Sequence, residues 1–470
     1  MLPADRLEWV EGWGMATGGS GYVFRPRDTG GVAEALETAR SAGVPLALRG
    51  AGCSYGDAAL RGESFILDLS ELNRVLEWNP DSGIIDVEPG VSLGVVWRLV
   101  IGDGWWPPVV TGTMEPTIGG MLAMNVHGKN NWQRGTIGDH CLELDVVLAD
   151  GESRSISKES APDLFHGLIG SFGQLGITTR ARLQMKKVHS GLLEVRAVAA
   201  PDLESMLLLA DEAKEKWEYV VGWIDAFATG KDLGRGLLHF ARHLEEGEDP
   251  DPAASLDAGA QDLPGRLFGV IPKTQMWRLI KPFTNRLGMR LINSGKYLAG
   301  STLGDDKVFR QSLAEFSFLL DYVPNWKHIY LPGGLIQHQS FVPMASAEEV
   351  FHNQLEICRE CRMPSFLAVL KRHRPDPFLM GHGVDGFSLA LDFPVVRGRR
   401  EELWAMVREL AGPVVAAGGR FYPAKDSALT ADLYRATFSD GQLDRFAELK
   451  SQLDPNRTLR TALADRLLYG

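Results

Sequence analysis

TGTMEPTIGGMLAMNVHGKNNWQRGTIGD, residues 111–139, is the stretch that decides which fold the sequence predicts. It places six glycines among Thr, Asn and His residues, with one short apolar run at residues 121–125. Glycines at this density let the backbone take positive φ and approach a ligand closely. Successive N–H groups can then converge on anionic oxygens, and the apolar run predicts a short buried helix whose N-terminus points at the same place. The stretch predicts a diphosphate-binding segment.

Two further glycine-rich loops, RGAGCSYGD at residues 49–57 and GSFGQLGI at residues 170–177, belong to the same part of the chain. The first follows an expected helix and strand, and each of the others adjoins short apolar runs. Helices are expected at residues 31–43 and 90–100, and strands at residues 44–48, 64–69, 83–88, 142–148 and 178–185. Three such loops tied to short strands predict one nucleotide-type domain within the first ~190 residues.

The second half of the chain has longer strands around amphipathic helices, which predicts an α+β sheet domain. Strands are expected at residues 192–200, 219–227, 328–331, 334–343, 366–371 and 386–393, and helices at residues 203–217, 347–358 and 401–417. The tail, residues 443–468, is expected to be helical with a break at Asp454-Pro455. Residues 245–264 are acidic and rich in Pro, Ala and Gly, which predicts a mobile loop.

Composition excludes some classes of protein. The chain has 470 residues, 44% of them hydrophobic and 23% charged, as in an ordinary globular protein of more than one domain. A net charge of -11 argues against nucleic-acid binding. The negative net charge argues only weakly against docking on anionic lipid, because a protein with a negative net charge can still carry a local basic patch.

The first residues show no signal-peptide pattern, and no apolar run is long enough to span a bilayer. The four cysteines suit a reducing compartment, so a cytoplasmic location is expected. Cys358 and Cys361 form a lone C-x-x-C without a partner pair, which we interpret as structural, and no metal site is expected.

The glycine loops match neither of the commonest nucleotide motifs. No G-x-x-x-x-G-K-[ST] is present, and the G-x-x-G-x-x-G of residues 170–176 has the wrong spacing for a Rossmann fingerprint. We therefore expect a dinucleotide held by a different fold.

The ordered set of motifs resembles a known superfamily. Arg49-Gly-x-Gly-x-Ser-Tyr-Gly-Asp57, Thr117-Ile-Gly-Gly120 and the 170–176 loop resemble the FAD-binding loops of vanillyl-alcohol-oxidase-type (PCMH-type) flavoproteins. Further motifs are similar to the decaprenylphosphoryl-β-D-ribose 2′-oxidase family, the flavin half of a two-enzyme epimerase. These are Gly12-Trp-Gly14, His127-Gly-Lys-Asn130, Gln337-His-Gln339, Phe366-Leu-Ala-Val-Leu-Lys371, Asp392-Phe-Pro394 and Tyr422-Pro-Ala-Lys-Asp426. The resemblance covers nearly the whole chain in the same order.

The resemblance implies a two-domain α+β flavoprotein. Residues 1–190 and the C-terminal segment 416–470 would form the FAD-binding domain, and residues 191–415 a cap that builds the substrate site. It implies oxidation of a secondary alcohol of a sugar-like substrate to a ketone, with hydride passing to flavin N5. A polyprenyl-phosphate-linked pentose is the leading substrate, and an NAD(P)H-dependent keto-reductase the implied partner. Such a substrate would also imply peripheral membrane contact. The acidic residues 245–264 are poorly suited to bind lipid, so the part of the chain that would make this contact stays open.

The site residues are carried over motif by motif. The expected FAD-binding residues are Arg49, Gly50, Ala51, Gly52, Cys53, Ser54, Tyr55, Gly56, Gly112, Thr113, Thr117, Ile118, Gly119, Gly120, Asn125, His127, Gly128, Asn130, Gly135, Thr136, Gly176, Ile177 and Tyr422. The expected catalytic residues are Lys425, His127 and Tyr55. Lys425 would supply a cation where the flavin ring gains negative charge, or position the alcohol; His127 is a group that can accept a proton near pH 7.

The expected substrate-binding residues are Gln337, Gln339, Lys371 and Lys425. Gln337 and Gln339 are two residues apart, so both face the same side of a strand. An alternating polar pair is more often a solvated face, and the resemblance is what favours the substrate role. Lys371 could also bind a phosphate group of the substrate.

Two departures from the related sequences bear on chemistry. Cys53 stands where many members of the superfamily carry a flavin-linking histidine, so non-covalent FAD is expected, although a cysteinyl link is chemically conceivable. Ala390 stands where the best-known ribose oxidases carry a cysteine, which leaves the exact substrate open. The alternatives are an alditol or aldonolactone oxidase using O2, which usually carries that histidine, a reductase of the same fold, and a flavin-free scaffold.

Overall fold

A computed structural model describes residues 4–267, 271–438 and 441–470. The N-terminal half contains two sheets. The first has the order β1-β2-β4-β3 and the second the order β5-β6-β10-β8-β9. Their strands are β1 (Leu7–Glu11), β2 (Gly18–Phe24), β3 (Leu46–Arg49), β4 (Phe65–Asp68), β5 (Val75–Asn79), β6 (Ile84–Val87), β8 (Cys141–Val147), β9 (Ser153–Ser157) and β10 (Ile177–Gln184). The helices of this half are α1 (Thr29–Ala42), α2 (Leu93–Val100), α3 (Ile118–Ala123), α4 (Asn131–Arg134) and α5 (Pro162–Leu168).

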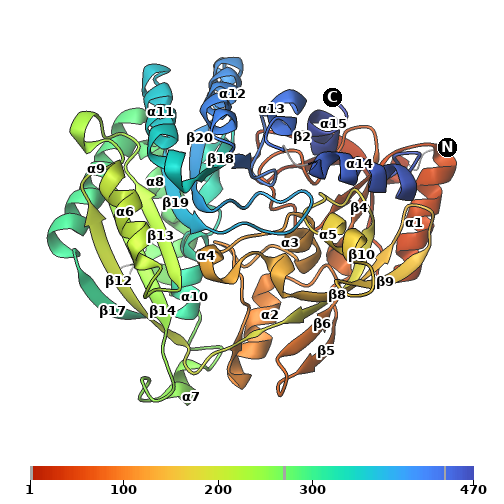
Figure 1. The fold of residues 1–470 in the computed structure, drawn as a ribbon, viewed down its shortest axis with the longest axis horizontal. Helices are drawn as coiled ribbons and strands as arrows, with labels where there is room; N and C mark the ends of the chain where they lie inside the picture. Colours follow the sequence, from red (N-terminus) through yellow and green to blue (C-terminus); the bar gives the residue numbers. More distant parts are fainter. Residues whose placement is uncertain (1–3, 268–270, 439–440) are drawn as a thin grey trace.

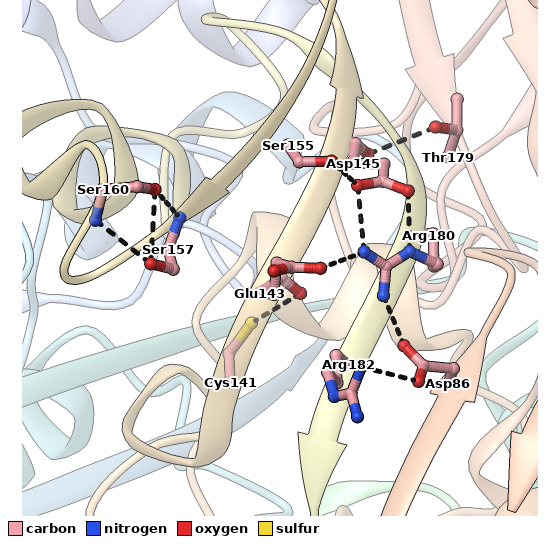
Figure 2. Close-up of polar contacts among 10 residues, drawn as sticks. All are labelled: Asp86, Cys141, Glu143, Asp145, Ser155, Ser157, Ser160, Thr179, Arg180 and Arg182. Atoms are coloured by element: carbon pink, nitrogen blue, oxygen red, sulfur yellow. Dashed lines mark hydrogen bonds and ion pairs between the residues drawn. The ribbon is translucent and has the colours of Figure 1, made fainter.

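One arginine joins three strands of the second sheet (Figure 2). Arg180 on β10 donates to Asp145 Oδ2 over 2.6 Å and also contacts Glu143, both on β8, while a third nitrogen reaches Asp86 on β6. Burial alone would raise the pKa of Asp145, but hydrogen bonds from Arg180 and Ser155 outweigh it and lower that pKa. Arg180 therefore stabilises the register of the strands that carry the central stretch.

The second half is built on one antiparallel sheet of eight strands, in the order β17-β12-β14-β13-β19-β20-β18-β21. The strands are β12 (Leu192–Ala200), β13 (Tyr219–Ile224), β14 (Gly236–His243), β17 (Lys307–Ser312), β18 (Leu335–Pro343), β19 (Leu367–His373), β20 (Gly386–Pro394) and β21 (Arg420–Phe421). Two short pairings, β7 (Trp105–Trp106) with β11 (Lys186–Lys187) and β15 (Arg266–Leu267) with β16 (Ile271–Pro272), complete the strands.

Helices cover this sheet on both faces (Figure 1). On one face pack α6 (Leu203–Ala213), α11 (Ala347–Glu360) and α12 (Arg400–Ala416). On the other, α9 (Arg286–Leu303) lies over β12 and β14. The remaining helices are α7 (Pro252–Ser255), α8 (Met276–Ile280), α10 (Leu313–Ser317), α13 (Ala431–Arg435), α14 (Gln442–Leu453) and α15 (Ala462–Leu467).

The two-domain α+β architecture is confirmed, whereas the boundaries at 190/191 and 415/416 stay predictions. The C-terminal segment returns to the first sheet, where Leu46 N donates to Thr458 O over 2.7 Å. Among the described residues, no helix is both long and apolar enough to cross a membrane.

Two predictions about local structure were wrong. Residues 328–330 lie in a 3-10 turn, Trp326–Tyr330, which Leu331 follows, and none of them is in a strand. Residues 245–264 contain α7 and are anchored to the rest of the chain. The buried Gln261 amide donates to Gly191 O over 2.9 Å and accepts from Ala314 N over 3.1 Å. The acidic composition of the segment gave no indication of these hydrogen bonds, because they join residues that are far apart in the sequence.

Candidate active site

A cavity of about 810 Å³ separates the glycine-rich loops from the eight-stranded sheet. One wall is formed by the first loop, the central stretch and the third loop, and the other by strands β13, β14, β18, β19 and β20. Most of its lining is apolar, with a few convergent polar groups, as is usual for cofactor sites.

The first loop, residues 49–57, provides a run of unsatisfied donors. None of the backbone N–H groups of residues 50–54 donates a hydrogen bond to another described residue, and all five residues line the cavity. Gly52 has φ +68°, and a Cβ at Gly50 would lie 2.2 Å from Thr117 Oγ1, a buried oxygen without a hydrogen-bond partner among the described residues. Free N–H groups in a glycine cradle fit the anionic diphosphate of FAD.

Helix α3 contributes less to that cradle than the sequence predicted. Ile118 N donates to Val91 O over 2.9 Å and Gly119 N to Pro89 O over 2.8 Å, so both are already satisfied. The helix also spans only six residues. Within the first turn of α3, Gly120 N has no acceptor among the described residues, so the first loop provides most, but not all, of the free donors on this wall.

The first loop is held from behind by two arginines. Arg49 donates to Glu11 O and Ala59 O, each over 3.3 Å, so its side chain supports the loop. Arg466 on α15 binds both oxygens of Asp57, over 2.8 and 3.0 Å, and also contacts Asp426. Because Asp57 and Asp426 flank the two loops that carry Tyr55 and Lys425, Arg466 fixes those loops relative to each other.

The structure brings most of the predicted cofactor residues together. Those that line the cavity are Arg49, Gly50, Ala51, Gly52, Cys53, Ser54, Tyr55, Gly112, Thr113, Thr117, Gly119, Gly120, His127, Gly176 and Tyr422. The others lie behind this wall: Gly56, Ile118, Asn125, Gly128, Asn130, Gly135, Thr136 and Ile177. Thr136, for example, pairs with His127 in a β-bridge, and Asn130 donates to Pro108 O over 3.0 Å. Their geometry suits supporting the loop, and their contact with FAD stays a prediction.

The cap wall is one face of three paired strands. Gln337 on β18 lies opposite Asp392 on β20, and Gln339 lies opposite Ala390. Across the next pairing, Lys371 on β19 lies opposite Ser388. Since side chains alternate along a strand, these residues all face the cavity side of the sheet.

Four lysines, Lys129, Lys296, Lys371 and Lys425, bring titratable groups into the cavity. Burial lowers the pKa of Lys425 to about 8, although Asp392 and Cys53 oppose the shift. Burial and then the charge of Lys425 lower the pKa of Lys371 to about 8. Burial and then Lys371 lower the pKa of Lys129 to about 7, and its Nζ donates to Ser317 O over 3.2 Å. Such lysines exchange protons close to neutral pH.

His127 lies in a buried aromatic cluster. Its ring centroid is 4.9 Å from that of His373 and 5.0 Å from that of Tyr422, and its Nε2 lies 3.2 Å from the Gln339 amide nitrogen. Burial, followed by the charge of Lys371, holds the pKa of His127 well below its usual range. The prediction that His127 accepts a proton near pH 7 is therefore not supported, since a neutral imidazole with so low a pKa serves as a hydrogen-bond partner.

Asp392 is the carboxylate nearest to this chemistry. Its Oδ1 accepts from the Gln337 amide, while its Oδ2 is buried without a partner among the described residues. Burial raises its pKa to about 6 against the effects of Gln337 and Lys425. Burial likewise raises the pKa of Tyr55 well above 10, so Tyr55 stays a neutral phenol.

The sequence interpretation did not select several wall residues. They are Lys129, Trp223, His239, Lys296, Phe316 and Asp392. Lys129 and Asp392 stand in motifs quoted for the resemblance, which is the signal that could have found them. His239 lies on β14, a strand that was not predicted.

Cys53 lines the FAD end of the cavity as a protonated thiol. Burial raises its pKa to about 12, with Glu115 adding to the shift. Because the thiolate is the nucleophilic form, this environment disfavours a covalent flavin link. Within the described residues, no group of three or more His, Cys, Asp or Glu side chains is placed to hold a metal ion.

Comparison with known proteins indicates FAD as the cofactor. Residues 20–157 match the family model described as FAD binding domain. The chain is 28% identical to decaprenylphosphoryl-beta-D-ribose oxidase of Mycolicibacterium smegmatis, over 97% of this chain and 96% of that protein. It is 25% identical to D-lactate dehydrogenase of Archaeoglobus fulgidus, over 73% of this chain and 88% of that protein. It is also 29% identical to cytokinin dehydrogenase 2 of Oryza sativa, over 46% of this chain and 40% of that protein.

Fold, cavity and comparisons together define an FAD-dependent oxidoreductase of two-domain α+β architecture. Its FAD-binding domain is of the vanillyl-alcohol-oxidase (PCMH) type, and its whole chain is similar to the decaprenylphosphoryl-ribose oxidase family.

Proposed function

We propose that this enzyme oxidises a secondary alcohol of a sugar-like substrate to a ketone, and that a polyprenylphosphoryl pentose oxidised at its 2′-position is the substrate. The observation that carries the proposal is the polar face of Gln337, Gln339, Lys371 and Asp392 opposite the glycine cradle. It is supported by similarity over 97% of the chain to a decaprenylphosphoryl-ribose oxidase. The two glutamine amides suit the hydroxyl groups of a sugar, each of which both donates and accepts.

Bound FAD would be held by the first loop and the central stretch, and the chemistry it supplies is acceptance of a hydride from the carbinol carbon. The remaining proton leaves the substrate hydroxyl. Lys371 and Lys425 are suited to accept it, because both have a pKa of about 8. Because burial and the charge of Lys425 lower the pKa of Lys371, Lys371 can be neutral and accept the proton while Lys425 stays an ammonium. We place the neutral amine at Lys371 and the cation at Lys425, whose charge Asp392 supports.

His127 and Tyr55 act as orienting groups in this proposal. The Gln339 amide nitrogen lies 3.2 Å from His127 Nε2 and donates to Ser388 Oγ over 3.2 Å, so His127 and Ser388 together orient this amide at the cavity wall. Tyr55 packs under Lys425 as a neutral ring. An NAD(P)H-dependent reductase that returns the ketone as an epimer is the proposed partner, and the proposed location is cytoplasmic with at most peripheral membrane contact.

Anaerobic titration of the holoenzyme tests the substrate. Flavin absorbance in the blue region would be followed while a polyprenylphosphoryl ribose analogue, free alditols and D-lactate are added separately. Bleaching by the lipid-linked pentose alone is expected. Bleaching by alditols alone would instead identify a polyol oxidase, and re-oxidation of dithionite-reduced enzyme by an alkene substrate would identify a reductase. If no alcohol bleaches the flavin, the substrate proposal fails while the cofactor assignment stands.

A further inference from the structure

One segment of the cap differs in charge from the rest of the molecule. Residues 273–304 contain Lys273, Arg278, Lys281, Arg286, Arg290 and Lys296 and no Asp or Glu, in a chain whose net charge is -11. The segment folds as α8, a 3-10 turn (Lys281–Phe283) and α9, which follow one another with two residues between the turn and α9. Figure 1 shows α9 on the side of the molecule opposite α1.

The same segment exposes large apolar side chains to solvent. The exposed fractions are 53% for Leu279, 55% for Phe283, 69% for Leu287, 65% for Leu291 and 63% for Leu298. At 100° per residue, the three α9 leucines lie within about 40° of one another around the helix. An exposed apolar stripe of this kind marks an interaction surface more often than a solvated one.

The cations beside the stripe are not held in salt bridges by the described residues, although burial raises the pKa of the Asp321 carboxyl and the charge of Lys273 partly opposes that rise. Lys273, Arg278, Lys281, Arg286 and Arg290 form no salt bridge within the described part of the chain. We call these five cations and the five apolar side chains above the α8–α9 face. Some exposed arginines elsewhere are paired, as Arg27 is with Glu71 over 2.6 Å, whereas others, such as Arg397, form no salt bridge within the described residues. The face therefore differs from the rest of the surface by placing five cations, none in a salt bridge where the structure describes the chain, beside exposed apolar area.

The other side of α9 belongs to the active-site cavity. Lys296 Nζ lies 4.1 Å from the Trp223 ring centroid, and both residues line the cavity. Gly300 packs against Leu237 on β14, where a Cβ would approach to 2.5 Å. Lys296 lies 180° around the helix from Leu287 at 100° per residue. Helix α9 therefore separates the cavity from the α8–α9 face.

We propose that the α8–α9 face docks the enzyme on the surface of a lipid bilayer rich in anionic headgroups. An apolar stripe flanked by arginines is the pattern of a helix that lies in the membrane interface. Each cation near an anionic surface adds an attraction of about fivefold in affinity. The proposal rests on this face alone and not on the proposed substrate. Docking would place the wall of the cavity against the bilayer.

Vesicle flotation of the FAD-loaded full chain tests the proposal. Vesicles of phosphatidylcholine alone and with 30–40% phosphatidylglycerol (roughly the range that gives a strong surface potential) would be compared at low and high salt. Wild type is expected to float with the anionic vesicles only, and less at high salt. Arg286→Glu with Arg290→Glu should weaken binding by about 30-fold or more. Leu287→Ser with Leu291→Ser should weaken it also at low salt.

Two matched variants control for charge and hydrophobicity. Lys158→Glu with Arg397→Glu changes the net charge by the same amount at exposed sites elsewhere, and Leu99→Ser with Leu208→Ser removes exposed leucines of α2 and α6. Both controls should bind vesicles as wild type does, and all variants should retain the flavin spectrum. The proposal would be overturned if the wild type does not bind the vesicles, or if the control variants lose binding to the same extent. It would also be overturned if the wild type forms a dimer that the leucine variant disrupts and no vesicle binding is seen. Because none of these readouts uses turnover, they are independent of the substrate assignment.

Discussion

The ammonium of Lys425 lies 3.7 Å from the centroid of the Tyr55 ring. A cation over an aromatic face is attracted by its quadrupole, so the phenol ring supports the charged lysine in a buried setting. The two side chains come from loops joined by a hydrogen bond from Tyr55 N to Ala424 O of 2.9 Å. The loop of residues 49–57 and the C-terminal segment thus build one structural unit at the proposed reaction centre.

Lys425→Ala is expected to keep FAD and the fold but to lower the anaerobic rate of flavin reduction by ~10²–10⁴-fold, because the cation that offsets developing charge is removed. Stopped-flow absorbance with the lipid-linked pentose measures this. Lys231→Ala, at an exposed position, is the control and should be unaffected. Wild-type reduction by the Lys425 variant would exclude a catalytic role.

The rate of flavin reduction should depend on pH as the lysine pair titrates. It should rise as the first proton leaves the pair and fall as the second leaves, with a maximum near pH 8, because both pKa values are lowered to about 8. Lys371→Met should remove the rising limb and slow the reaction. A rate that stays flat through this range would contradict proton transfer to the pair.

Asp392→Asn should stabilise the protein at neutral pH. The pKa of Asp392 is raised to about 6 from an ordinary 3.8, so its carboxyl favours folding below pH 4 and that contribution is lost as pH rises to 6. The variant should gain about 1–3 kcal/mol at pH 7 and nothing below pH 4. Urea unfolding at both pH values measures the difference. Loss of the carboxylate should also lower the pKa of Lys425, which moves the pH maximum of reduction downward.

Acid precipitation of the holoenzyme should release FAD into the supernatant, because the Cys53 thiol has a pKa of about 12 and forms little thiolate. Cys53→Ser should release it equally. Yellow colour that stays with the wild-type precipitate and is lost from the Cys53→Ser precipitate would establish a covalent link.

Arg180→Gln should destabilise the FAD-binding domain by ~1–3 kcal/mol, with the lower end favoured because Glu143 and Asp145 are partly exposed. The pKa of Asp145 is lowered in the folded protein, so the stabilisation it contributes is present above pH 4 and lost below it. The cost of Arg180→Gln measured by urea unfolding should therefore shrink between pH 5 and pH 3. A cost independent of pH would show that packing, and not the ion pairs, is what the variant removes.

The sequence was sufficient to predict features that depend on residues close together in the chain, namely strands and glycine-rich loops. The strands expected at residues 334–343 and 386–393 match β18 and β20 within one residue, and the loop of residues 49–57 could be located from its glycines. What could not be predicted depends on contacts between distant residues. Asp392 gains its raised pKa from burial in the folded sheet, and Arg466 reaches Asp57 from the far end of the chain. Helix α9 was missed because Gly288, Gly295 and Gly300 interrupt its pattern.

Because β19, β20 and β18 are paired, the side chains of the proposed substrate wall lie in regular rows across the three strands. Positions repeat every ~6.8 Å along each strand and every ~4.8 Å across strands. Gln339, Ala390 and Val369 occupy one row, and Gln337, Asp392 and Leu367 the next. The residues of each row face the cavity and can be changed without altering the glycine loops on the opposite wall. If this wall binds the substrate as proposed, substrate choice can be altered one row at a time.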